Sequence, residues 1–230
     1  MNAPMRHSRT MIRSVDLNDA NECTRLDAWI AAQPDGTPFH RPAWLKGVEA
    51  GTGQQALCLV AESRAGELQG MVPLHLVHSP LFGRALVSSG FAVGGGILAT
   101  SPAAAKALGE TVWNYAQRHS CPTVELRGGM LPKSGWIIKS EAHANFARPL
   151  SADDETELLA IPRKQRAEVR KGLENALEIV TGNSQRDQDW HYAVYAESVR
   201  NLGTPVFPKA LMSEVMSAFG DDADILTVLS

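Results

Sequence analysis

The alternation of apolar and polar positions predicts two short helices near the start of the chain. Residues 1–13 are mostly polar and show no periodicity, so we expect a disordered lead-in there. Beyond it, apolar positions recur at helical spacing in two segments. The first should be capped by Asp16 or Asn18 and end before Pro34, and the second should begin at Pro42. The glycines expected to end the second helix are Gly51 and Gly53.

From residue 56 onward the pattern changes to the apolar runs that are typical of strands. The longest run, Leu68–Val77, contains Pro73, which predicts a bulge or an edge strand because proline cannot donate a ladder hydrogen bond. A helix is expected from Ser101 to about His119. The other segments expected to form strands are Ala56–Ala61, Ala85–Ser88, Gly96–Leu98, Thr123–Arg127, Trp136–Ile138 and Asn145–Ala147.

Around Ser151 the order of elements begins again. Ser151 and the acidic residues close after it indicate a helix start, and Pro162 separates that short helix from a longer one. The elements expected next are a strand at Leu177–Thr181, helices at Asp187–Asn201 and Pro208–Phe219, and a strand at Asp224–Leu229. We therefore expect a first domain over residues 14–150 and the N-terminal part of a second over residues 151–230. The last strand has no partner strand after it, so either the first domain covers it or the natural protein continues beyond Ser230, and we expect the second.

Composition excludes several classes of protein. The 230-residue chain has a formal net charge of -3, whereas a DNA-binding domain is usually basic. It has no uncharged apolar run of about 18 residues, so we expect no transmembrane segment. Cys23, Cys58 and Cys121 lie far apart without metal-ligand spacing and are expected to be reduced thiols. These features predict a cytoplasmic protein with no metal site.

A basic helix over residues 161–176 carries the most informative pattern. At about 100° per residue, Val169 and Leu173 mark an apolar stripe, while Lys164 and Lys171 face away from it. The arginines on or beside the stripe are Arg163, Arg166 and Arg170. Cations in the first turns of a helix are unfavourable unless an anion is near, and guanidinium groups suit phosphate or carboxylate. Either acidic residues of the first domain pair with these arginines, or the arginines contact an anionic substrate.

Two other segments contain candidate ligand contacts. The amides of Gly94, Gly95 and Gly96, which precede a helix, could approach a donor phosphate. The alternative is that these glycines serve a bulge and a close approach of strands. Upstream, His40, Trp44 and Lys46 are candidate substrate contacts, with a place in the core as the alternative for Trp44.

Two histidines and one loop have less specific patterns. His75 and His78 lie three apart on a predicted strand and hence on opposite faces, which suits surface histidines better than a metal site. The proline-containing segment Asn201–Pro208 should form a rigid loop, which could shape a pocket or simply separate two helices.

Three motifs together resemble one known family. The segment Phe39-His-x-Pro-x-Trp44 resembles an early motif of FemAB-like proteins, and Ile161-Pro-Arg-Lys-x-Arg-x-Glu-Val-Arg-Lys171 resembles the basic helix that opens their second domain. The segment Ser198–Phe207 resembles the version in FemAB-related proteins that accompany exosortase/PEP-CTERM and exopolysaccharide gene sets. The resemblance covers most of the chain from about residue 14.

The resemblance implies an α+β fold with two tandem GNAT-like domains, the second one truncated here, and a substrate cleft between them. Characterised members transfer an amino acid from aminoacyl-tRNA to an amine of a peptidoglycan precursor. By this resemblance Lys46 and either Arg166 or Arg170 contact nucleotide-sugar phosphates. The long helical arm of the staphylococcal enzymes and the C-terminal half of the second domain are not visible. The chain alone could therefore lack activity.

The expected function is transfer of an acyl or aminoacyl group to an amine on an anionic cell-envelope or exopolysaccharide-related acceptor, such as a lipid-linked glycan. The co-substrate is aminoacyl-tRNA or acyl-CoA, with no permanently bound cofactor, and the place of action is the cytoplasm or the inner face of the membrane. The alternatives are an N-acetyltransferase that uses acyl-CoA or acyl-carrier protein, and a non-catalytic component of an export locus. The sequence identifies no catalytic residue.

Overall fold

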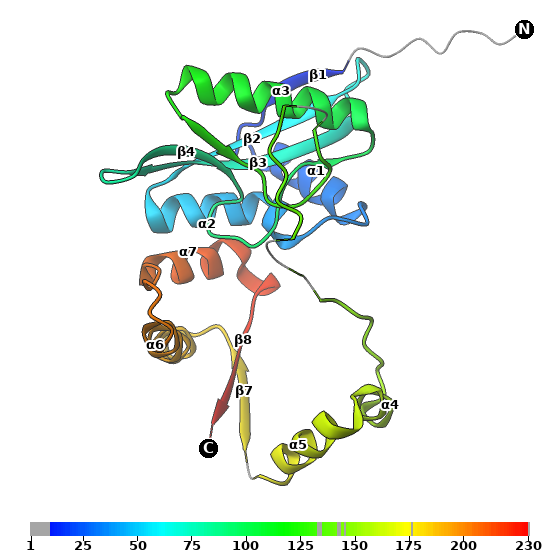
Figure 1. The fold of residues 1–230 in the computed structure, drawn as a ribbon, viewed down its shortest axis with the longest axis vertical. Helices are drawn as coiled ribbons and strands as arrows, with labels where there is room; N and C mark the ends of the chain where they lie inside the picture. The colour runs from blue at the N-terminus through cyan, green and yellow to red at the C-terminus, as the bar shows by residue number, and fades with distance from the viewer. Residues whose placement is uncertain (1–9, 133–134, 142–143, 145, 176, 230) are drawn as a thin grey trace, which may run out of the picture. The chain divides into compact units, whose positions relative to one another are not determined.

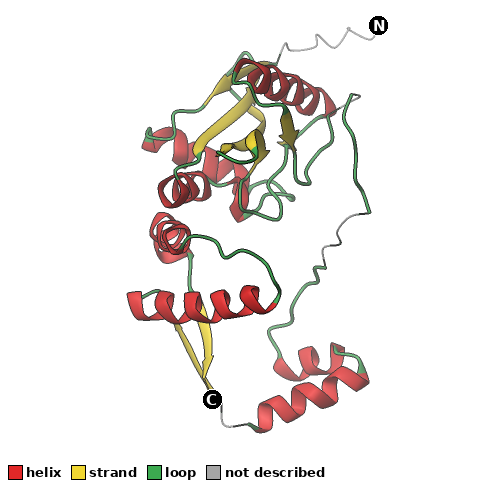
Figure 2. Ribbon diagram, turned by 60° about the vertical axis from the view of Figure 1, so that its left-hand side comes forward, coloured by secondary structure: helices red, strands yellow, loops and turns green. Residues whose placement is uncertain are grey.

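The computed structural model describes residues 10–132, 135–141, 144, 146–175 and 177–229, which form two compact units (Figures 1 and 2). The first unit comprises Met1–Trp136 and Tyr192–Ala223, and the second comprises Ile137–His191 and Asp224–Ser230. Each unit is described by itself below.

A mixed sheet forms the centre of the first unit. Its strand order is β1-β2-β3-β4-β6, with β5 also paired to β3, and all pairs are antiparallel except β4 with β6. The strands are β1 (Met11–Ser14), β2 (Gln55–Glu62), β3 (Leu68–Ser79), β4 (Gly83–Ser88), β5 (Leu98–Ala99) and β6 (Thr123–Glu125). The chain is thus already ordered at Met11, inside the expected lead-in, and β5 starts two residues later than the predicted Gly96.

Helices cover both faces of this sheet, with α3 on one face and α1 and α2 on the other (Figure 1). The helical elements of the unit are α1 (Ala20–Ala31), η1 (Pro38–His40), α2 (Pro42–Thr52), α3 (Pro102–Arg118), α7 (Lys209–Phe219) and η2 (Gly220–Asp222). Successive β2 residues alternate between the two cores: Leu59 and Ala61 pack on the α3 side, and Cys58 and Val60 on the α1 side. Burial on both faces explains why these strands read as continuous apolar runs.

The ends of the first two helices correct the predicted caps. The cap of α1 is Asp19, whose side chain accepts hydrogen bonds from the amides of Asn21 and Glu22. Neither Asp16 nor Asn18 caps this helix, so that prediction was wrong. Gly53 ends α2 in the left-handed conformation, as predicted.

Glycines inside α2 let α7 approach closely. Gly51 does not end the helix but lies in its last turn, four residues after Gly47. A Cβ atom on Gly47 would lie 2.7 Å from Cα of Val215, and one on Gly51 would lie 2.5 Å from Cα of Leu211. The two helices therefore pack backbone against backbone, and a methyl group at either glycine has no room.

Pro73 lies in the middle of the sheet, not at an edge or a bulge as predicted. It pairs with Cys58 of β2, and its carbonyl accepts a hydrogen bond from the Ser89 amide on the other side. On that side β5 pairs at Met71 and β4 pairs from Leu74 onward, so Pro73 occupies the place between them. A strand residue points its N and O atoms to the same side, so no ladder bond is lost at Pro73.

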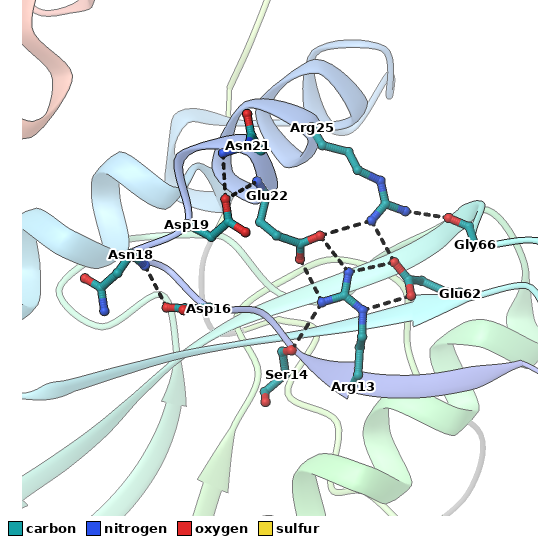
Figure 3. Close-up of polar contacts among 10 residues, drawn as sticks. All are labelled: Arg13, Ser14, Asp16, Asn18, Asp19, Asn21, Glu22, Arg25, Glu62 and Gly66. Carbon is teal, nitrogen blue, oxygen red and sulfur yellow. Dashed lines mark hydrogen bonds and ion pairs between the residues drawn. The ribbon is translucent and has the colours of Figure 1, made fainter.

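An ion-pair network joins β1, β2 and α1 (Figure 3). The Arg13 guanidinium donates to Glu62 from Nε at 2.9 Å and to Glu22 from Nη1 at 2.7 Å. Arg25 pairs with the same two carboxylates. Hydrogen bonding from Arg13 lowers the pKa of Glu62. This network fixes the first strand against the first helix.

The second unit is built from two helices and a two-stranded antiparallel sheet. Its elements are α4 (Asp154–Ala160), α5 (Arg163–Glu174), β7 (Glu178–Gly182) and β8 (Ile225–Leu229), and α6 (Gln185–Asn201) leads from it into the first unit. Asp153, not Ser151, caps α4. The strand predicted at Trp136–Ile138 was wrong, since these residues lie in a loop where Ile137 is 93% exposed. Asn145 lies outside the described residues, and Phe146 and Ala147 are not in a strand.

Candidate functional site

Two segments singled out in the sequence meet in the first unit, at the start of α2. The Trp44 indole donates to the Gly90 carbonyl at 3.2 Å, and the Ser89 hydroxyl donates to the Phe39 carbonyl at 2.7 Å. The rings of Phe39 and Trp44 contact edge to face, with centroids 4.9 Å apart. Trp44 is half-buried, and its role as a substrate contact stays a prediction. The Phe39–Trp44 motif and the Gly90–Gly96 loop are thus one structural cluster.

His40 links these two segments directly. Its Nδ1 accepts from the Thr37 amide at 3.2 Å, so Nε2 carries the proton and donates to the Gly96 carbonyl at 3.2 Å. The side chain is buried, and burial lowers its pKa. Both ring nitrogens are therefore occupied by the fold, and His40 holds the glycine loop in place.

His75 also holds this loop through hydrogen bonds. The prediction of a surface position for His75 was wrong. Its Nδ1 accepts from the Gly90 amide at 3.0 Å, and its Nε2 donates to the Leu45 carbonyl at 3.3 Å. The side chain is fully buried, which lowers its pKa to about 4. His78, on the opposite face, is exposed as expected.

The glycines of the loop are explained by close backbone packing. A Cβ atom on Gly96 would lie 1.9 Å from the Gly128 carbonyl oxygen, and Gly95 has a φ of +86° with no room beside Ser89. Only Gly94 has open space, with its nearest neighbour 3.8 Å away. The close-approach interpretation accounts for two of the three glycines. A role of this loop in binding donor phosphate stays a prediction.

The predicted Asn201–Pro208 loop also reaches this cluster. Phe91, which has a strained φ of +65°, packs edge to face on Phe207 with centroids 5.3 Å apart. Tyr192 donates to the Phe207 carbonyl at 3.0 Å, and the Phe207 amide donates to the Tyr195 hydroxyl at 3.3 Å. Strained backbone of this kind is stored where surrounding contacts hold it, often at functional sites.

The three arginines of α5 have different environments. Arg166 donates from Nη2 to the Leu159 carbonyl at 2.7 Å and from Nε and Nη2 to the Ile161 carbonyl. It thereby satisfies carbonyls at the end of α4, a role that neither sequence interpretation foresaw. Arg163 and Arg170 are exposed. No ion pair joins either of them to an acidic residue within the described ranges.

Lys46 and Arg41 lie on α2 and at its N-terminus. Lys46 is exposed. Arg41, which the sequence interpretation overlooked, pairs with Asp27 at 3.1 Å and Asp222 at 2.7 Å and lies over the Phe219 ring. It borders an open cavity of about 430 Å³ beside α1. Its place inside the Phe39–Trp44 motif was the signal that could have drawn attention to it.

The described part of the chain contains neither a metal-binding cluster nor a membrane-spanning helix. No group of three or more His, Cys, Asp or Glu residues there is arranged to hold a metal ion. None of the described helices is both long and apolar enough to span a membrane.

Comparisons with known proteins found similar solved structures but no similar sequence family. No family model and no curated protein matches the chain. The structure of FemX matches with a TM-score of 0.63 and 14% identity, over 95% of this chain and 57% of FemX. A ribosomal-protein-alanine N-acetyltransferase from Brucella melitensis biovar Abortus 2308 has a TM-score of 0.39 at 21% identity, covering 60% of this chain and 99% of its own. An aminoglycoside 6'-N-acetyltransferase from Acinetobacter baumannii has a TM-score of 0.37 at 15% identity, with 62% and 99% covered.

The FemX similarity defines the class of fold. The chain has the mixed α+β fold of FemX, which confirms the predicted fold class. It spans about 57% of the length of FemX.

Proposed function

We propose that this chain is part of a transferase that moves an acyl or aminoacyl group onto an amine of an anionic acceptor. The observation that carries the proposal is the FemX fold, shared over 95% of the chain. The three FemAB-like motifs support it. The acceptor we propose is a cell-envelope or exopolysaccharide precursor, such as a lipid-linked glycan, at the inner face of the membrane.

Arg163 and Arg170 are the proposed anion contacts. They lie seven residues apart, which puts both guanidinium groups on one side of α5 two turns apart. Both are exposed, and Arg166 fixes the start of the helix through backbone carbonyls. Guanidinium forks suit phosphate oxygens, so the pair fits a diphosphate or two separate phosphates. Lys46 is proposed as a further phosphate contact by its match to the family motif.

The reaction that we propose needs positioning more than a covalent nucleophile. The acceptor amine attacks the carbonyl carbon of the activated donor, an amide bond forms, and the ester C–O or thioester C–S bond breaks. The amine proton leaves with the departing hydroxyl or thiol. Holding the acceptor by its phosphates would supply the effective concentration that such a step requires.

Charge reversal on α5 tests the acceptor site. The double variant Arg163→Glu/Arg170→Glu should bind a nucleotide-activated sugar peptide at least about tenfold more weakly, because two guanidinium contacts are replaced by repulsion. The matched control is Lys164→Glu/Lys171→Glu, which makes the same charge change about 100° further round the helix. Calorimetric titration measures both. Equal binding by the two double variants would remove this site.

A transfer assay tests the reaction and identifies the donor. In the assay we expect transfer of a radiolabelled acyl or aminoacyl group from acyl-CoA or charged tRNA to the amine of the sugar peptide. Transfer from acyl-CoA alone would favour the N-acetyltransferase alternative. If the protein binds the acceptor but transfers nothing from either donor, the non-catalytic alternative is favoured over the proposal.

A further inference from the structure

The turn between β3 and β4 presents two large apolar side chains to solvent. Leu81 is 82% exposed and Phe82 is 86% exposed, and they are adjacent in sequence. In Figure 1 this turn projects beyond the helices that cover the sheet. Single exposed apolar residues are ordinary on protein surfaces, but a projecting pair at a hairpin tip forms a patch.

The backbone of the tip is pre-organised. The Ser79 hydroxyl accepts hydrogen bonds from the amides of Leu81 and Phe82, at 3.3 and 3.2 Å. Pro80 fixes its own φ angle, and Gly83 closes the turn with a φ of +79°. The two apolar side chains are thus held outward by a defined turn. Little conformational entropy would be lost on inserting them into an apolar medium.

Basic side chains lie at the base of the tip. His78 and Arg84 are cross-strand partners at its base, so their side chains share one face of the hairpin, and both are exposed. Arg84 donates to the His119 carbonyl, which brings the end of α3, with exposed Arg118, to the same place. The sequence has no Asp or Glu between Glu67 and Glu110. This charge pattern complements an anionic surface.

We propose that the β3–β4 hairpin tip, Ser79–Gly83, is an interfacial anchor that inserts Leu81 and Phe82 into an anionic lipid surface while His78 and Arg84 contact the headgroups. Apolar side chains flanked by cations are the combination that binds such interfaces. A short tip of this kind gives reversible attachment. The inference specifies which part of the chain would hold it at the membrane that the proposed function names. It rests on the proposed function only for the identity of the acceptor.

Vesicle flotation tests the anchor. Vesicles of phosphatidylcholine mixed with phosphatidylglycerol should carry the chain, and vesicles of phosphatidylcholine alone should carry it at least about tenfold less, because the cations lose their partners. Leu81→Ser/Phe82→Ser should lower anionic-vesicle binding at least about tenfold. Arg84→Glu should lower it as well. The matched control is Ile179→Ser/Leu226→Ser, which removes two side chains that are 65% and 63% exposed on β7 and β8.

Insertion has its own signature. In the variant Phe82→Trp, brominated lipids should quench tryptophan fluorescence beyond the quenching seen for the wild-type chain, because the new indole enters the acyl region. Circular dichroism confirms that each variant is folded. Three results would each overturn the anchor: no vesicle binding by wild type, undiminished binding by the Leu81/Phe82 variant, or no added quenching. Self-association that depends on the tip, without vesicle binding, would assign the patch to a second copy instead.

The anchor and the proposed function fail separately. With a soluble sugar-peptide acceptor and no vesicles, Leu81→Ser/Phe82→Ser should transfer at the wild-type rate, since neither residue is a proposed substrate contact. A chain that transfers but never binds vesicles refutes only the anchor. A chain that binds vesicles but never transfers refutes only the transferase.

Discussion

The two units of this chain are stabilised in different ways. In the first unit both faces of the sheet are buried under helices, and close backbone contacts fix the loops. In the second unit α4 and α5 contain no buried residue, and among the buried apolar residues of the described chain only Ile225 belongs to it. There, local polar contacts such as those of Arg166 define the geometry. The difference teaches that the two candidate regions must be tested with different measurements.

The same difference bears on the candidate residues. In the first unit His40, Trp44 and the loop glycines are engaged in packing and hydrogen bonds, so their substitution would change the fold first. On α5, Arg163 and Arg170 are exposed and can be changed at little cost in stability. A binding defect from the arginine variants is therefore easier to interpret than one from the glycine loop.

The largest effect is expected at Gly96. The Cβ of Gly96→Ala would lie 1.9 Å from a backbone oxygen that cannot rotate away, so we expect a loss of about 3 kcal/mol or more in the free energy of unfolding. The control is Gly94→Ala two residues earlier, where the nearest atom is 3.8 Å away and the change should be within about 0.5 kcal/mol. Urea unfolding followed by circular dichroism measures both. Similar stabilities for the two variants would show that the first unit tolerates displacement of this loop.

An intermediate effect is expected from pH through His75. Its pKa is lowered to about 4, so between its usual value of 6.5 and 4 the unfolded chain binds a proton that the folded chain does not. Stability is therefore fully present above pH 6.5 and falls as the pH is lowered. Between pH 7 and 5 this single group should account for a loss of about 2 kcal/mol.

The variant His75→Gln should unfold with a correspondingly shallower pH dependence, because the glutamine does not titrate. The control His78→Gln makes the same substitution on the exposed face of the strand. Urea midpoints measured at several pH values provide the comparison. If the urea midpoints of His75→Gln and wild type change with pH in the same way, His75 is not a buried, neutral side chain in the folded protein.

The sequence predicted the succession of elements well because local signals determine it. Pro42, Gly53 and the Ser101-Pro102 pair lie where helices begin or end, and apolar runs such as Ala56–Ala61 fall inside strands. Tertiary contacts were harder to foresee. Gly51 looks like a helix terminator, yet it is used for the contact with α7, which lies far away in the sequence.

The candidate site shows the same limit. A proline in a strand usually means an edge, but the gap between β4 and β5 that accommodates Pro73 is a property of the whole sheet. His75 reads as a surface residue by spacing, although the Gly90 amide and Leu45 carbonyl make its burial possible. Arg166 differs from the other two α5 arginines because it reaches the carbonyls at the end of α4. The helical periodicity of the sequence does not show where those carbonyls lie.

The smallest effect is expected on α5, and it tests the contrast between the units most directly. Leu173 is 71% exposed, so Leu173→Ala should change stability by no more than about 0.5 kcal/mol. The same substitution at Leu108 on α3, which is fully buried, should cost about 2–5 kcal/mol because it leaves a cavity. Hydrogen exchange resolved by peptide reports each helix separately, and α5 amides should exchange faster than α3 amides before any substitution. Slow exchange in α5 together with a loss of several kcal/mol in Leu173→Ala would show that its apolar stripe is packed in solution, and the two units would then be stabilised in the same way.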